Sequence, residues 1–505
     1  MIKVDAKIHD KFSVEFKVSF LPQNKACSNN FKTNTWIFIP NSLDINSSTY
    51  GKDQFYRDVK SNIRLVTPQF LFSDITDNGS IPFEKFKKSV EKYLNKPTEE
   101  NKIKYEYHTK MFAAICHSSV RNSTNKIASS KKSQSTIKLC QEFIQNLEDI
   151  TKKYRDFIHS SEFQNKETRH PLRFADEYLT QIFDIYVYKV IRKIKRSLKK
   201  IRSKESYSEE TYKEFHNVYD RIKAFLINEK KYKKANNHFY IKSNDENNNR
   251  YVIFRHGALK KFVESDMYIK LNKKEDGFAI RQLFYGIAAG LAMIFATIIA
   301  FSFKWKFGSV STQLFIALVI SYILKDRIKE LTRYYFSDKL NTRFYDDKAN
   351  INISHDKVGW IKESVDFTKE RNMPKEVISI RNRSSLLEYE NKIFNEKIIF
   401  YRKRVFLDGK ELAKHSTYKT NGVTDIMRLY MNRFIQKTDN PTVNMNFIND
   451  DDDIDSTKTQ KIYYINIVMQ FIYNDQEEYK RFRIVLVRSG ILSIESDEEI
   501  NSCTI

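Results

Sequence analysis

The ten histidines and four cysteines are the side chains best suited to metal binding or nucleophilic chemistry, and they are scattered along the chain. The cysteines form no CxxC pair, and no two histidines lie three or four residues apart. This spacing argues against a zinc site and against a disulfide framework. It favours a reducing compartment, and we expect no bound metal.

One acidic run resembles the beginning of a calcium-binding loop. Asp451, Asp453 and Asp455 occupy alternate positions, as in an EF-hand. The sixth position of that loop is Ser456 instead of glycine, and the twelfth is Ile462 instead of glutamate. The pattern therefore predicts a solvated hairpin loop.

Short catalytic motifs are missing from the sequence. It contains neither the GxxxxGK[ST] phosphate loop nor the GxGxxG dinucleotide turn, and neither GxSxG nor HExxH occurs. We expect no cofactor and favour a protein that is not an enzyme. An active site assembled from distant residues remains a third hypothesis for function.

The most informative stretch has no catalytic character. Leu283–Phe303 contains no charged residue, and a second uncharged run, Phe307–Leu324, follows after a short polar break. About 20 apolar residues are needed to cross the hydrocarbon core of a bilayer. The sequence predicts a transmembrane hairpin over 283–324, with helices at 283–303 and 307–324. The alternative is a buried central helix of a soluble domain, but such helices are usually shorter.

The break between the two runs consists of Lys304, Trp305 and Lys306. Tryptophan is enriched at membrane interfaces, and lysine extends its ammonium group toward water, so we expect an interfacial turn. Lysine and arginine are more frequent on both outer flanks of the hairpin than in this turn. The positive-inside rule then places both termini in the cytoplasm, at a plasma membrane of the bacterial inner-membrane type.

Small residues gather in the first predicted span. Gly286 and Gly290 form a GxxxG motif, with Ala289 and Ala292 beside it. Small residues allow the backbones of two helices to approach closely. The contact is either within the hairpin or between protomers of a homo-oligomer, and the sequence leaves both open. Neither span contains a charged residue, which argues against a transporter or proton relay.

The most basic soluble stretch is a predicted helix that ends near residue 204. An apolar stripe with helical spacing runs through 187–204, and the stretch contains no acidic residue. Such a helix can bind an anionic lipid surface, bind nucleic acid, or be a bundle helix with a solvated outer face. Its candidate binding residues are Lys189, Arg192, Lys193, Lys195, Arg196, Lys199, Lys200, Arg202 and Lys204.

The remaining pattern predicts a multi-domain membrane protein. Period-two alternation near the N-terminus indicates an α+β unit with an antiparallel sheet over 1–80, and apolar residues three and four apart indicate a mainly helical cytoplasmic region over 81–276. A helical connector over 325–345 then leads to a cytoplasmic α+β domain over 360–505 that ends in an antiparallel meander. Within these regions we expect a strand at Tyr251–Phe254 and a helix capped by Thr424.

The net charge of the chain predicts an anionic partner. The 505 residues carry 87 lysines and arginines against 63 acidic residues, a formal charge of +24 that suits an anionic partner. The leading hypothesis is a non-enzymatic membrane scaffold or an oligomerising membrane effector, with pore formation by clustered hairpins as its sharper version. The alternative is a membrane-tethered protein that binds nucleic acid or anionic lipid through the 187–204 helix.

Overall fold

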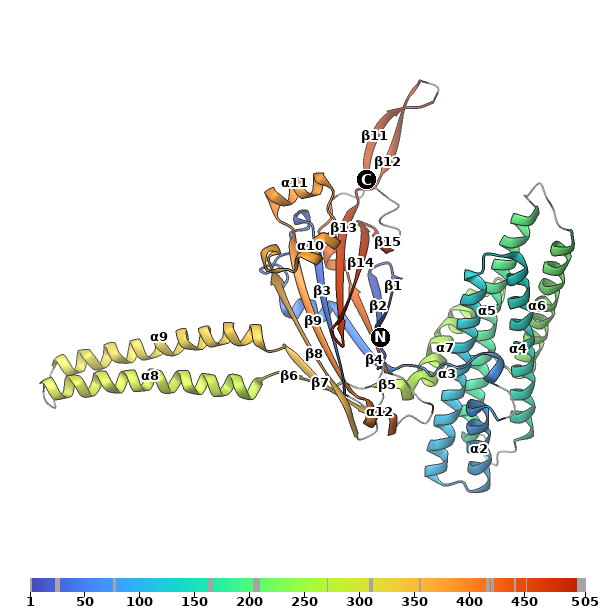
Figure 1. Cartoon of the computed structure of the whole chain (residues 1–505), viewed down its shortest axis with the longest axis horizontal. Helices are drawn as coiled ribbons and strands as arrows, with labels where there is room; N and C mark the ends of the chain where they lie inside the picture. The colour runs from blue at the N-terminus through green and yellow to red at the C-terminus, as the bar shows by residue number, and fades with distance from the viewer. Residues whose placement is uncertain are drawn as a thin grey trace. The chain divides into compact units, whose positions relative to one another are not determined.

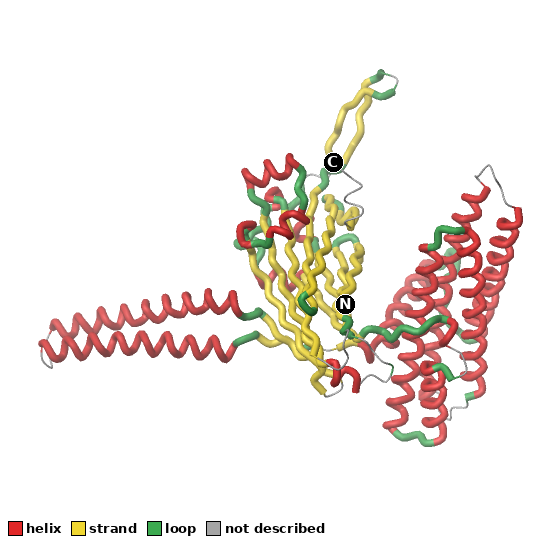
Figure 2. Tube along the Cα trace, viewed as in Figure 1, coloured by secondary structure: helices red, strands yellow, loops and turns green. Residues whose placement is uncertain are grey.

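The computed structural model describes residues 2–496 except 23–27, 76–78, 162–166, 203–208, 270, 308–311, 354–355, 415–417, 419–421, 440–441 and 451. Side chains within helices are also left undescribed at 167, 202, 306–307, 313–314 and 337–343. The chain forms two compact units (Figures 1 and 2). The sheet unit comprises Met1–Ile63, Ile269–His415 and Gly422–Ile505, and the helical unit comprises Arg64–Tyr268 and Ser416–Asn421.

An eight-stranded sheet organises the sheet unit. Its order is β15-β14-β13-β3-β9-β8-β7-β6, and every neighbouring pair is antiparallel. The strands are β3 (Ser28–Ile39), β6 (Lys273–Glu275), β7 (Asp347–Ile353), β8 (Asp356–Thr368), β9 (Lys397–Asp408), β13 (Tyr463–Tyr473), β14 (Gln476–Val487) and β15 (Gly490–Ser496).

The two ends of the chain share this sheet. The N-terminal strand β3 lies between β9 and β13, where Trp36 is opposite Phe400 on one side and Val468 on the other. The meander predicted at the end of the chain is present as β13–β15. Its separation from an N-terminal domain over 1–80 is wrong, because β3 supplies the hydrogen bonds and the buried face that complete it.

A five-stranded sheet, with the order β1-β2-β10-β4-β5, also joins distant segments. Its strands are β1 (Ile2–Asp10), β2 (Ser13–Phe20), β4 (Val59–Leu65), β5 (Tyr268–Ile269) and β10 (Val423–Tyr430). The helix expected after Thr424 is therefore wrong, since β10 pairs antiparallel with β2. Short apolar runs fit both periods, and the available partner strand decides between them.

Smaller elements complete the sheet unit. The short helices are α1 (Lys52–Asp58), α10 (Lys375–Arg381), α11 (Ser385–Phe394), α12 (Gly409–Lys414) and α13 (Asn432–Gln436). Strands β11 (Val443–Ile448) and β12 (Ile454–Thr459) form an exposed antiparallel hairpin around the acidic run, whose first residue, Asp451, lies outside the described residues.

Between β6 and β7 the chain forms a hairpin of two long helices, α8 (Phe278–Phe307) and α9 (Thr312–Arg343), which lie side by side in Figure 1. Because α9 is continuous, the second apolar run from Thr312 onward and the predicted connector belong to one helix. Both ends of the hairpin continue directly into neighbouring antiparallel strands of the large sheet.

The helical unit is built from long helices. They are α2 (Ile81–Asn95), α3 (Glu99–Ser129), α4 (Ser133–Ser160), α5 (His170–Arg202), α6 (Glu209–Ala235) and α7 (Glu246–Glu264). Thr98 caps α3 by accepting a hydrogen bond from the Asn101 backbone amide, and aromatic rings fill the core, with Phe86 stacked on Phe112 at 5.0 Å. The strand expected at Tyr251–Phe254 is wrong, because α7 contains this segment after an Asp245 cap.

Candidate membrane helix and charged clusters

Helix α8 exposes the side chains that a soluble protein would bury. Leu283, Met293, Ile294, Ile298 and Phe301 are each at least half exposed. The apolar segment Phe278–Trp305 is long enough to cross a bilayer, and only 11% of its most apolar window is buried. A core helix of a soluble domain would be mostly buried, so that alternative fits α8 poorly. The length and composition of α8 are those of a membrane span.

Helix α9 does not meet the same criterion. Among the described residues, α8 is the one helix that is long and apolar enough to span a membrane. Part of the second predicted span, 307–324, lies outside the described residues, and α9 continues into the charged segment 325–343. The structure thus contains the helical hairpin, while a membrane crossing by its second helix is unconfirmed.

Alanines lie at the contact between the two helices, and nearer the base Phe284 of α8 packs against Phe336 of α9 with ring centroids 4.9 Å apart. Ala288 and Ala292 of α8 are completely buried, and Ala317 of α9 is 7% exposed. The Ser321 hydroxyl of α9 donates to the carbonyl oxygen of Ala296 at 3.2 Å. Small side chains let the helices approach until such a contact forms. We call these alanines and Ser321 the alanine seam.

The predicted GxxxG motif lies outside this seam. Gly286 and Gly290 are exposed, and a Cβ atom added to either would meet no atom within 4 Å. Ala289 is half-buried, whereas Ala292 belongs to the seam. Packing of these glycines within the hairpin, one of the two alternatives left open by the sequence, is therefore wrong. The glycine face is open to whatever surrounds α8.

The interface turn predicted at Lys304, Trp305 and Lys306 is wrong, because helix α8 continues through these residues to Phe307. Lys304 is exposed and Trp305 is 94% exposed, and both belong to the last turn of the helix. The side chain of Lys306 lies outside the described residues. An exposed indole beside an ammonium group has the chemistry of a membrane interface, where tryptophan and lysine both gather.

A charged cluster fixes the base of the hairpin to the sheet. Asp346 directly precedes β7, and its carboxylate accepts hydrogen bonds from the Lys52 ammonium at 3.0 Å, the Tyr56 hydroxyl at 2.9 Å and the Val365 amide at 2.9 Å. At the other base, Lys362 donates to Asp276 at 2.9 Å. Both roots of the hairpin are therefore held by charge-assisted hydrogen bonds.

A buried set of charges lies next to this cluster. Lys403 is 4% exposed and contacts both Asp425 and Glu363, while Lys273 also contacts Glu363. These partners raise the pKa of Lys403 and lower the pKa of Glu363 despite burial. The Ser61 hydroxyl accepts from Lys403 at 3.0 Å, but an ammonium that retains its proton cannot activate a serine as a base would.

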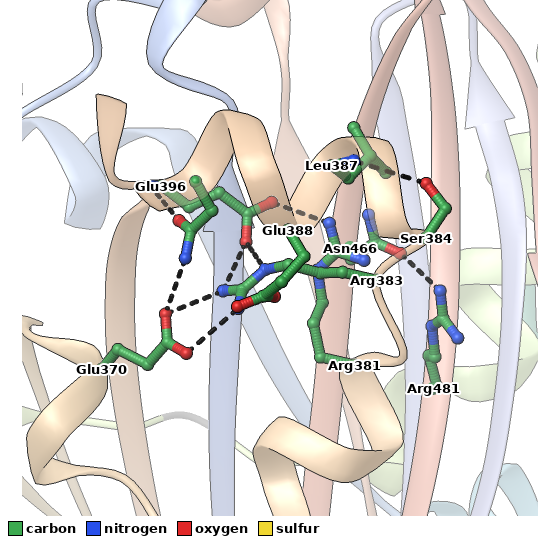
Figure 3. A network of polar contacts seen from close by, with 10 residues as sticks. Glu370, Arg381, Arg383, Ser384, Leu387, Glu388, Glu396, Asn466 and Arg481 are labelled. Carbon is green, nitrogen blue, oxygen red and sulfur yellow. Dashed lines mark hydrogen bonds and ion pairs between the residues drawn. The ribbon is translucent and has the colours of Figure 1, made fainter. Parts of the chain in front are cut away.

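A cleft of 790 Å³ is lined in part by Glu370, Asn391 and Glu396. Figure 3 shows the charged network to which Glu370 and Glu396 belong. Arg383 donates two parallel hydrogen bonds of 3.0 Å to Glu370 and one of 2.9 Å to Glu396, and it also bonds Glu388. Arg381 reaches the second oxygen of Glu396 at 2.7 Å. These pairs lower the pKa of Glu370, so its carboxylate stays ionised and is unsuited to proton transfer.

The basic helix of the sequence is the second half of α5, and its apolar stripe is already occupied. Val187, Val190 and Ile194 are completely buried in the core of the helical unit, and Leu198 packs against that core. A helix that inserts into a membrane surface must keep this face free. Amphipathic insertion by α5 is therefore excluded, and the basic residues form the outer face of a bundle helix.

The predicted basic residues occupy different positions on that face. Lys193 is half-buried, and its ammonium donates to the carbonyl oxygens of Ala128 at 3.1 Å and Ser130 at 2.7 Å. Lys204 and the side chain of Arg202 lie outside the described residues. The exposed members of the set are Lys189, Arg192, Lys195, Arg196, Lys199 and Lys200.

Buried histidines in the helical unit are held neutral. His117 lies between the Tyr178 hydroxyl at 2.8 Å and the Tyr186 hydroxyl at 3.1 Å, and burial lowers its pKa to about 3. A general base needs a pKa near the working pH, which His117 lacks. Among the described residues, no three histidine, cysteine or acidic side chains are grouped to hold a metal ion.

No protein-family model, no curated protein and no solved structure matches this chain. Function must therefore be argued from the sites themselves.

Proposed function

We propose that the chain is an integral membrane protein whose α8–α9 hairpin anchors two cytoplasmic units, and that it acts as a non-enzymatic scaffold or oligomerising effector. One observation carries the proposal: α8 is long and apolar, and only 11% of its most apolar window is buried. In water, exposing such a surface is unfavourable by roughly 25 cal/mol for each Å². In a bilayer the same apolar surface contacts hydrocarbon chains and this cost is absent.

The rest of the hairpin fits this environment. Trp305 and Lys304 at the tip have the chemistry of a membrane interface, and basic residues flank both bases. The apolar first half of α9 would be the second crossing, and the bases of the hairpin would then lie on the cytoplasmic side of the plasma membrane. The open face at Gly286 and Gly290 would meet lipid or a second copy of the chain.

The test is extraction of the membrane fraction with alkaline carbonate, applied to the natural chain and to the double variant Ile294→Lys/Ile298→Lys. Both isoleucines are more than half exposed on α8. Each lysine near the centre of a span opposes insertion by roughly 3 kcal/mol. We expect the natural chain to stay in the pellet and the variant to appear in the carbonate supernatant or to be degraded.

The matched control is Ile241→Lys/Ile253→Lys, which changes two isoleucines that are each 72% exposed in the helical unit. This variant should remain in the pellet. Release of the natural chain by carbonate would overturn the proposal. Equal release of both variants would show that added charge, and not the bilayer, determines the result.

A further inference from the structure

A groove in the helical unit lies between α5 and the C-terminal end of α3. It encloses about 660 Å³, and its α3 wall includes Thr124, Asn125, Ile127 and Ala128. The cationic side chains that line it all come from α5, namely Lys189, Arg192, Lys193, Arg196, Lys199 and Lys200. They recur every three or four residues, which aligns them along one face of the helix.

No carboxylate interrupts either wall. Helix α5 has no acidic residue after Asp184, and α3 has none after Glu106. Further cations follow on the α3 side, at Lys126, Lys131 and Lys132, all of them exposed. Like charges at this density repel each other and destabilise the helix, so an anion that bridges them is stabilising.

Lys193 makes the α3 wall compatible with an anion. The carbonyl end of a helix carries a partial negative charge that repels phosphate. The Lys193 ammonium neutralises this end of α3 by donating to the carbonyl oxygens of Ala128 and Ser130. Lys193 is thus used inside the protein, whereas the guanidinium groups of Arg192 and Arg196 are exposed along the groove.

The shape of the site favours a polymer over a lipid surface. The apolar stripe of α5 is buried, so the helix has no continuous apolar face that would enter a membrane. The cations line a groove instead of a flat face. Tyr188 is 52% exposed and lies one turn before Arg192, which places an aromatic ring beside the row of cations. Cationic grooves with adjacent aromatic rings bind single-stranded nucleic acids through the backbone and the bases.

We propose that this groove binds the phosphate backbone of a single-stranded nucleic acid, and that Tyr188 stacks on one of its bases. The groove would give the membrane protein an anionic polymer as partner, a role that goes beyond anchoring or scaffolding.

The test measures binding of a fluorescent 20-nucleotide oligouridylate to the purified full-length chain in neutral detergent micelles. If about four phosphates are contacted, the slope of log K against log salt should be about −3. Raising the salt concentration from 50 to 200 mM should then weaken binding about fiftyfold. A duplex of the same length should bind more weakly, because its bases are not free to stack.

Two variants locate the site. Arg192→Glu/Arg196→Glu should weaken binding about tenfold or more and make the salt slope shallower by about 1.4. The control Lys230→Glu/Lys234→Glu makes the same change in charge on the exposed surface of α6, near the pair formed by Lys233 with Asp184. It should bind like the natural chain. Circular dichroism must show that both variants are folded.

Tyr188 gives a separate readout. Tyr188→Ala should weaken binding on the order of tenfold without changing the salt slope, and Tyr188→Phe should restore it. The proposal is overturned if the natural chain does not bind at 50 mM salt, or if the α6 control loses as much affinity as the groove variant. It is equally overturned if the groove residues retain phosphatidylglycerol in mixed micelles but do not bind the oligonucleotide.

Discussion

Helices α5 and α8 are of similar length, 33 and 30 residues, yet they expose opposite kinds of side chain. In α5 the apolar stripe is buried in the bundle and the lysines and arginines face outward. In α8 most of the large apolar side chains face outward, and alanines make the contact with α9. The charged outer face of α5 suits water, whereas the apolar outer face of α8 would suit hydrocarbon if the proposed membrane span is correct.

This difference shows that an apolar residue does not mark the same kind of surface in every helix. In the helical unit, apolar residues mark the faces that touch other helices. In the hairpin the side chains at the alanine seam are small, and most of the large apolar side chains of α8 are exposed, although Phe284 packs against Phe336 of α9. Hydrocarbon solvates leucine as well as a protein core does, so membrane helices associate through close backbone approach instead of through burial of large side chains.

The largest expected effect is a difference in stability loss when a buried isoleucine and an exposed isoleucine are each replaced by alanine. Ile194→Ala in α5 empties a completely buried position and should lower the free energy of unfolding of the helical unit by about 2–5 kcal/mol. Ile294→Ala in α8 changes a side chain that is 57% exposed and should cost less than about 0.5 kcal/mol in detergent. Hydrogen exchange of peptides from the two helices measures both. Similar losses would mean that α8 is a core helix.

The next largest effect is that of acid, which should destabilise the helical unit at a higher pH than the sheet unit. The pKa of His117 is about 3 in the folded chain against an ordinary value of 6.5. Between these pH values the imidazole of His117 is protonated in the unfolded chain and neutral in the folded chain. The stability contributed above pH 6.5 is therefore lost as the pH falls, by about 3 kcal/mol at pH 4.5. Burial likewise lowers the pKa of His238 to about 4. Asp176 acts in the opposite direction, because burial raises its pKa to about 6.

The sheet unit should respond at lower pH. Hydrogen bonding to Arg428 and the charges of Lys7 and Lys17 outweigh burial and hold the pKa of Glu15 at about 2, so its contribution is lost only as the pH falls from about 4.5 toward 2. Hydrogen exchange at pH values between 7 and 4 should show α3 and α5 opening before β2. His117→Gln should reduce the loss in α3 and α5. An unchanged acid response in this variant would rule out His117 as a cause.

The smallest effect concerns the two faces of α8. Ala292→Leu overfills the seam with α9 and should weaken the hairpin by about 1–3 kcal/mol. Gly290→Leu adds its side chain where a Cβ atom meets nothing, so the hairpin should be unaffected. Packing at the alanine seam is measured by introducing Ala296→Cys and Ser321→Cys together and following the rate at which the two cysteines form a disulfide.

The size of the protein–detergent particle shows whether protomers associate through the open face at Gly286 and Gly290. If Gly290→Leu makes an oligomer smaller without changing the rate of cross-linking, protomers associate through the glycines. If the size is unchanged, the face meets lipid alone.

Several features follow from local pattern. The long uncharged run became α8, and the alternation in 462–495 became β13–β15, because hydrophobic period depends only on neighbouring residues. The basic residues of α5 were also identified from the sequence. Their groove was not, because its second wall is α3, more than 60 residues earlier in the chain.

Strand pairing between distant segments explains where the structure departs from the local pattern. The segment after Thr424 fits a helix and a strand equally well, and the edge of β2, about 400 residues away, selects the strand. The same long-range pairing joins β3 to β9 and β13, which no local signal at 1–80 or 360–505 reveals.

The sequence alone determined where most of the long helices lie, α7 being the exception, and which of them is apolar and which is basic. Only the tertiary structure decided which face of each helix is free. It buried the apolar stripe of α5 and so excluded insertion into a membrane surface, and it paired α8 with α9 through alanines and left the glycines open. The physical reason is that periodicity identifies the faces of a helix, whereas the partner that covers each face comes from elsewhere in the chain.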